Sequence, residues 1–227
     1  GTMAQNRRPR RAKKRSALYA PLTFIIVCAA LVFAVGVFFR VMTIEVTGEE
    51  YYGEEEIIEA SGIEVGDNLF FINRFTSASR IFSKLPYVQS VTVSRSLPNK
   101  VVIEVVEART LAYVPLDMRL WVIDQNCKLL DTIEQQEADD LIEIMGVTLT
   151  SPEVGLTMTV TDADSTTVPY LADMLSAMLE LSMIDDVSYI DMSNIANPVF
   201  DYQDRFTVKL GTEDDVRYKL ELLLSAV

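Results

Sequence analysis

The sequence predicts an α+β protein: one N-terminal transmembrane helix, then a small β-α-α-β-β domain, then a mixed β-rich domain with helices packed on its sheet. Three observations predict this class. An uncharged apolar run lies near the N-terminus. After it, two short segments with apolar residues at helical spacing lie among segments in which apolar and polar residues alternate. The remainder consists mostly of further segments that alternate in the same way. The 227 residues allow two small domains once the apolar run is set aside.

The apolar run, residues 17–39, contains 23 uncharged and mostly apolar residues. A helix of this length is about 35 Å long and can cross a hydrocarbon core about 30 Å thick. Residues 1–16 carry seven basic side chains and no acidic one. The positive-inside rule therefore predicts a cytoplasmic tail, a single span that contacts the lipid bilayer, and an exported remainder. Gly1 and Thr2 are interpreted as a cloning remnant.

A cleaved signal peptide is the alternative interpretation of the apolar run. The apolar region of a signal peptide usually has 7–15 residues, although Val32-Phe33-Ala34 could imitate a cleavage site. The length of the run favours a retained anchor. The basic tail is interpreted as a topology determinant, and attraction to anionic lipid is compatible with that role.

Composition argues against catalysis and against nucleic-acid binding. All 33 carboxylates lie beyond Arg40, and such an acidic region repels phosphates. The sequence has no histidine, which excludes Ser-His and Cys-His pairs and most zinc sites. We therefore predict that the protein is not an enzyme and has no catalytic residue, cofactor, metal site or small-molecule substrate. Cys28 and Cys127 are expected to lie in different environments without a disulfide.

Carboxylate pairs are the nearest approach to a catalytic or calcium site. Pairs of this kind more often belong to caps, turns or solvated faces, and no EF-hand loop is complete. We interpret Met174, Met178 and Met183 as core residues, and Trp121 as a half-buried strand residue. The pairs considered are Asp139-Asp140, Asp162 with Asp164, Asp185-Asp186 and Asp214-Asp215.

Residues 40–108 predict the small β-α-α-β-β domain. Apolar and polar residues alternate over 43–47, which indicates a strand. Acidic residues at 54–56, together with Gly62 after the last turn, indicate a short helix. A second helix over 75–85 ends before Pro86, and two strands at 91–94 and 101–106 flank a turn. We expect residues 41–107 to fold autonomously around one core, formed by Ile57, Ile58, Phe75, Ile81, Phe82, Val91, Val93, Val101, Ile103 and Val105.

Residues 109–227 predict the second, β-rich domain. Alternating or apolar segments indicate strands, and apolar residues at helical spacing indicate two helices, one of them covered on most sides. The expected strands are 111–114, 120–124, 128–130, 141–144, 187–192 and 206–210, and the expected helices are 168–182 and 216–227.

Residues 40–108 contain four short motifs in a fixed order. They are Ile44-x-Val46-x-Gly48, Gly62-Ile63-x-x-Gly66-Asp67-Asn68-Leu69, Pro86-x-Val88-x-x-Val91-x-Val93-x-Arg95 and Pro98-x-x-Val101-x-Ile103-x-Val105-x-Glu107. Their order and spacing resemble those of a POTRA (polypeptide-transport-associated) domain, and a POTRA domain directly after one N-terminal span is similar to the FtsQ/DivIB cell-division proteins. Ala108, between Glu107 and Arg109, departs from the family pattern.

The resemblance implies a non-enzymatic bitopic scaffold of the bacterial divisome. Such a scaffold would lie in the cell membrane at the division septum, with its C-terminal domain extracytoplasmic, and would assemble or regulate septal wall synthesis. The implied partners are FtsB/DivIC-like and FtsL-like coiled-coil membrane proteins. The alternative is a membrane-tethered POTRA chaperone or transport component that guides extended polypeptides.

The resemblance implies that partners bind by strand addition near the C-terminal end of the β-domain, where the family has a last strand after the final helix. This chain stops at the end of that helix, so we expect a β-domain without the last strand, either because the sequence is truncated or because this member lacks that strand. An open sheet edge offers unpaired N–H and C=O groups to a partner. The expected edge residues are Arg205, Phe206, Thr207, Val208, Lys209 and Leu210.

Overall fold

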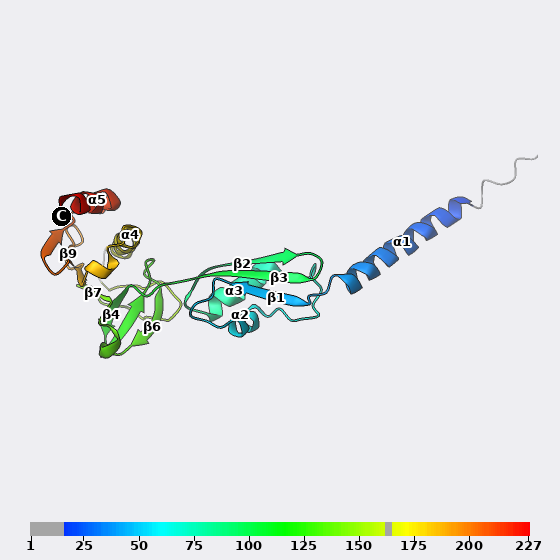
Figure 1. Cartoon of the computed structure of the whole chain (residues 1–227), viewed down its shortest axis with the longest axis horizontal. Coiled ribbons are helices and arrows are strands. Elements are labelled where there is room, and N and C mark those ends of the chain that lie inside the picture. The colour runs from blue at the N-terminus through cyan, green and yellow to red at the C-terminus, as the bar shows by residue number, and fades with distance from the viewer. Residues whose placement is uncertain (1–15, 162–164) are drawn as a thin grey trace, which may run out of the picture.

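The computed structural model describes residues 16–161 and 165–227. The basic tail up to residue 15, Asp162 and Asp164 lie outside the described residues. Figure 1 shows a long helix, α1, followed in chain order by a three-stranded sheet and a seven-stranded sheet.

Helix α1 spans Ser16–Phe38 and includes Pro21. Within the described ranges it is the one helix that is long and apolar enough to cross a membrane, from Tyr19 to Phe38. The side chains described between these two residues are mostly exposed, because no other described element packs along most of this helix. The predicted helical span is therefore confirmed, and it fits a single-pass membrane protein.

The first sheet confirms the predicted β-α-α-β-β order. β1 (Thr43–Thr47) pairs in parallel with β3 (Lys100–Glu107), and β3 pairs in antiparallel with β2 (Val88–Ser96). α2 (Glu54–Ser61) and α3 (Arg74–Lys84) lie between β1 and β2 in the chain. These elements share one hydrophobic core.

The core of the first sheet corrects one part of the prediction. Ile57, Ile81 and Ile103 are fully buried, as expected, but Phe75 is 82% exposed and Phe82 is 44% exposed. Phe75 precedes Ile81 by six residues, which turns it about 240° around the helix and away from the buried face. The residues of α3 that are buried are Ser77 and Ile81, so the two phenylalanines were wrongly assigned to this core.

The second sheet contains seven strands in the order β10-β9-β8-β7-β4-β5-β6. β4 pairs in parallel with β7, β7 pairs in parallel with β8, and the other neighbouring pairs are antiparallel. The strands are β4 (Ala112–Leu116), β5 (Arg119–Ile123), β6 (Leu129–Ile133), β7 (Ile142–Met145), β8 (Tyr189–Asp191), β9 (Val199–Tyr202) and β10 (Phe206–Lys209).

Two helices pack on this sheet, α4 (Thr167–Glu180) and α5 (Val216–Ala226), and both were predicted. α4 lies deep in the core, where burial of a broad apolar face supplies most of the stabilisation of a helix. Met174, Met178 and Met183 are buried core residues, and Trp121 is half-buried on β5, as interpreted from the sequence. Cys127 is also fully buried, although its neighbours in the sequence are polar.

Candidate functional site: the free edge of the seven-stranded sheet

β10 forms one edge of the seven-stranded sheet and carries four of the six predicted partner-binding residues. Arg205 lies in the turn before β10, and Leu210 follows it directly. Among the described strands, only β9 pairs with β10, with Thr207 opposite Asp201 and Val208 opposite Phe200. The structure therefore brings the six predicted residues together at a sheet edge.

The direction of each backbone group along β10 follows from the ladder. The Leu210 N–H donates to the Pro198 carbonyl at 3.0 Å, which makes this residue pair a hydrogen-bonded one. Hydrogen-bonded and non-hydrogen-bonded pairs alternate along an antiparallel ladder. Val208 and Phe200 are therefore a hydrogen-bonded pair, while the N–H and C=O groups of Thr207 and Lys209 point away from β9 toward the open edge.

The side chains of β10 alternate between two faces of the sheet. Leu210 is buried, and Val208 is half-buried and packs against the core of the second sheet. Thr207 and Lys209 are exposed on the opposite face. An added strand would therefore meet apolar side chains on one face and polar side chains on the other.

Both ends of β10 are fixed by contacts with other elements. At one end, the Gln203 N–H in the β9–β10 turn donates to the Asp186 carbonyl at 2.7 Å. At the other end, the Tyr170 hydroxyl lies 2.9 Å from the Gly211 carbonyl and 3.0 Å from that of Thr212. Burial raises the pKa of Tyr170 to about 12. Contacts within the protein itself therefore hold both ends of the edge strand.

The opposite edge of the sheet, β6, is partly covered by the chain itself. The Leu129 N–H donates to the Leu156 carbonyl at 2.9 Å, and the Gly155 N–H donates to the Leu129 carbonyl at 2.7 Å. A loop that pairs with an edge strand occupies the groups an added strand would need. Of the two edges, β10 is therefore the more open.

Two of the acidic pairs singled out in the sequence meet beside the β9–β10 turn. Asp139-Asp140 and Asp185-Asp186 line a polar cleft of about 1020 Å³, together with Arg109 and Arg205. Arg109 forms an ion pair with Asp185 at 3.0 Å. Within the described residues, no group of three or more acidic or cysteine side chains is arranged to hold a metal ion.

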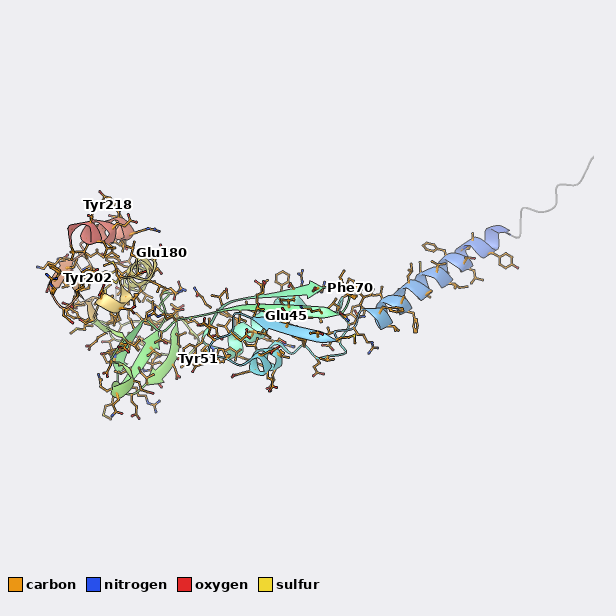
Figure 2. The ribbon with its side chains drawn as sticks, viewed as in Figure 1. Glu45, Tyr51, Phe70, Glu180, Tyr202 and Tyr218 are labelled. Carbon is orange, nitrogen blue, oxygen red and sulfur yellow. The ribbon has the colours of Figure 1, made fainter. Side chains whose placement is uncertain are left out.

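α5 contributes an exposed apolar surface that the sequence did not reveal. Val216 and Leu220 are buried, and Arg217 forms an ion pair with Glu180 of α4 at 2.7 Å. Tyr218 and Leu222, four residues apart on another side of the helix, are exposed. Figure 2 shows Tyr218 on α5 and Glu180 on the neighbouring α4.

Comparison with known proteins finds similarity to cell-division proteins. The protein-family model for the FtsQ-type POTRA domain matches residues 39–108 of this sequence. The cell division protein DivIB of Clostridium botulinum (strain Loch Maree / Type A3) is 27% identical over 217 residues, which cover 95% of this chain and 82% of that protein. The cell division protein FtsQ of Corynebacterium glutamicum is 37% identical over 75 residues, which cover 33% of each chain.

A solved structure, that of the major extracytoplasmic domain of the trans isomer of DivIB from Geobacillus stearothermophilus, is also similar. It is 17% identical, with a TM-score of 0.31, and the match covers 51% of this chain and 87% of the solved one. The FtsQ-type domain lies directly after α1, as the four sequence motifs predicted. The chain is therefore a homologue of the DivIB and FtsQ cell-division proteins and carries an FtsQ-type POTRA domain.

Proposed function

We propose that this protein is a bitopic scaffold of the bacterial divisome that binds its partners by accepting an added strand at β10. The observation that carries this proposal is the row of outward-pointing backbone groups at Thr207 and Lys209, on a strand that Asp186 and Tyr170 hold at both ends. The similarity to DivIB and FtsQ supports the role in cell division.

The partners that we propose are FtsB/DivIC-like and FtsL-like coiled-coil membrane proteins. A segment of such a partner would pair with β10 and extend the sheet by one strand. Main-chain hydrogen bonds then supply much of the affinity, each with a net contribution of about 1 kcal/mol. Side chains of the partner at alternate positions would lie on the core side, near Phe206 and Val208, and would supply specificity.

The membrane topology belongs to the same proposal. α1 would anchor the protein with the basic tail in the cytoplasm and both sheets outside, at the division septum. This arrangement places β10, the far edge of the second sheet, away from α1 (Figure 1). A partner with its own membrane anchor could reach that edge only with an extracytoplasmic segment, which agrees with the coiled-coil proteins named above.

The test is a proline substitution at an outward-pointing position. Thr207→Pro removes the outward N–H and places a ring in the path of the added strand, while the hydrogen bonds between β9 and β10 remain. Thr207→Val keeps the N–H and the β propensity. In copurification of the full-length chain with DivIC-like and FtsL-like partners, we expect Thr207→Pro to weaken binding at least about tenfold, or about 1.4 kcal/mol.

Val208→Pro is the contrasting variant, because its N–H points inward to Phe200 and its loss should destabilise the sheet itself. We expect Thr207→Pro to melt close to wild type and Val208→Pro to melt lower, by circular dichroism. A folded Thr207→Pro variant that binds both partners as well as Thr207→Val does would show that strand addition at β10 is wrong.

A further inference from the structure

The four residues after α1 are paired with two loops of the first sheet. The Leu69 N–H donates to the Phe39 carbonyl, and the Val41 N–H donates to the Asp67 carbonyl, each at 2.8 Å. The Met42 N–H donates to the carbonyl of Asn99 in the β2–β3 turn, also at 2.8 Å. The first sheet is therefore attached to the end of α1 by the backbone rather than by a free linker.

One contact fixes the depth of these loops along α1. The Asn68 side-chain amide donates to the Val35 carbonyl at 3.1 Å. Val35 lies three residues before Phe38, the last residue of the apolar span, which corresponds to about 4.5 Å along the helix. If α1 crosses a bilayer and its apolar span matches the hydrocarbon thickness, Asn68 therefore contacts α1 within about one helical turn of the boundary between the hydrocarbon and the headgroup region.

The loop around Asn68 exposes several apolar side chains. Phe71 is 83% exposed, and Phe70 packs edge-on against Phe39 with ring centroids 5.0 Å apart. Figure 2 shows Phe70 at the end of the first sheet that faces α1. The exposed apolar residues that adjoin the end of α1, here named the juxtamembrane collar, are Met42, Val65, Phe70, Phe71 and Leu97.

The collar brings side chains from three separate segments to one place. Met42 follows α1, Val65, Phe70 and Phe71 belong to the loop between α2 and α3, and Leu97 belongs to the β2–β3 turn. Several exposed apolar residues around one point mark an interaction surface. Aromatic side chains at the end of a transmembrane helix prefer the membrane–water interface, and Arg40 at the same level suits lipid phosphates.

We propose that the juxtamembrane collar inserts into the outer headgroup region of the bilayer and fixes the orientation of the first sheet on the membrane. The occupant of this apolar surface is lipid, because the hydrogen bonds to Val35, Phe39 and Val41 make the collar continuous with the membrane span. This inference rests on the part of the proposed function in which α1 crosses the membrane. It does not depend on strand addition at β10.

The test places a tryptophan in the collar of the full-length chain. In a Trp121→Phe background, Phe71→Trp reports on the collar, and Met118→Trp, in the exposed β4–β5 turn of the second sheet, is the matched control. Both proteins are reconstituted in vesicles of phosphatidylglycerol and phosphatidylcholine, with or without bromine atoms in the upper acyl chains. We expect blue-shifted emission and strong bromine quenching for Phe71→Trp, and neither for Met118→Trp.

Three outcomes would overturn the inference. Phe71→Trp could be quenched no more than Met118→Trp in vesicles that retain the protein, which would show that the collar is in water. Its blue shift could appear without bromine quenching, which would indicate contact with protein. Its emission could depend on the protein-to-lipid ratio, which would indicate a second copy of this chain. Failure of the protein to remain in the vesicles would instead contradict the membrane span of the proposed function.

Discussion

At the residue scale, Tyr170 connects the core of the second sheet to the candidate site. Its ring is buried on α4, and its hydroxyl lies within hydrogen-bond distance of the two carbonyls that follow β10. Buried polar groups that lose their partner are destabilising, so this one hydroxyl fixes the end of the edge strand. The sequence could not reveal this role, because nothing in it links position 170 to positions 211 and 212.

We expect Tyr170→Phe to lower the free energy of unfolding by about 1–2 kcal/mol, since it leaves the two carbonyls without that donor. The substitution should also change the response to alkaline pH. The pKa of Tyr170 is raised to about 12 in the folded protein, compared with 10.0 for a tyrosine in water. Stability from this group is complete below pH 10 and declines as pH rises toward 12, because only the unfolded state ionises readily there.

Melting temperatures from pH 8 to pH 12 check this prediction. Tyr170→Phe should lose less stability than wild type across the upper part of this range. The exposed Tyr218 offers the matched control, and Tyr218→Phe should follow the wild-type curve. Parallel curves for Tyr170→Phe and wild type would exclude the alkaline contribution of Tyr170.

At the element scale, the sequence predicted most helices and strands because their apolar periodicity is strong. Apolar and polar residues alternate over many positions of the hairpin formed by β2 and β3. The helix α2 has acidic residues in its first turn, and its C-cap is Gly62, with a φ of 68°. β9 was not predicted. It has four residues, follows Pro198 and contains Asp201, so its alternating burial is visible only once β8 and β10 lie beside it.

The candidate edge could be predicted only in part. The position of β10 as an edge follows from the order of seven strands, which no local pattern specifies, and the direction of the Thr207 and Lys209 backbone groups depends on the register with β9. The assignment of Phe75 to the core failed for a related reason. Apolar spacing in a short helix does not determine which of two overlapping faces is buried.

Paired substitutions test the corrected core of the first sheet. Ile103→Asp buries an unpaired charge at a fully enclosed position and should cost several kcal/mol, about 3 or more. Phe75→Asp places the same side chain at an exposed position in the first turn of α3, where a negative charge is favourable, and should change stability by less than about 0.5 kcal/mol. Chemical unfolding of the full chain in detergent compares them, and equal losses would contradict the assignment.

At the scale of the whole molecule, specific contacts join the two sheets. The Lys128 ammonium of the second sheet's domain donates to the Val88 carbonyl of β2 at 3.0 Å and lies 4.3 Å from the centre of the Phe82 ring. Burial lowers the pKa of Lys128. These contacts explain why Phe82 is only partly exposed, and they link the membrane-proximal sheet to the sheet that carries β10.

Tyr51, Tyr52 and Tyr87 form an aromatic cluster at the same junction. The rings of Tyr51 and Tyr87 are stacked 3.9 Å apart, and Glu107 accepts hydrogen bonds from the Tyr51 and Tyr52 backbone N–H groups. Figure 2 shows Tyr51 at the end of the first sheet that faces the second. The molecule therefore has a polar and aromatic junction between an end attached to α1 and an end that presents a free strand.

The central claim is that a partner strand pairs with β10, and amide hydrogen exchange measures this most directly. In the free protein, the N–H groups of Thr207 and Lys209 should exchange quickly, and that of Val208 slowly, because only Val208 donates to β9. In the complex with DivIC-like and FtsL-like partners, the account predicts strong protection of Thr207 and Lys209, with Val208 little changed. Rapid exchange at both Thr207 and Lys209 in a saturated complex would contradict strand addition at this edge.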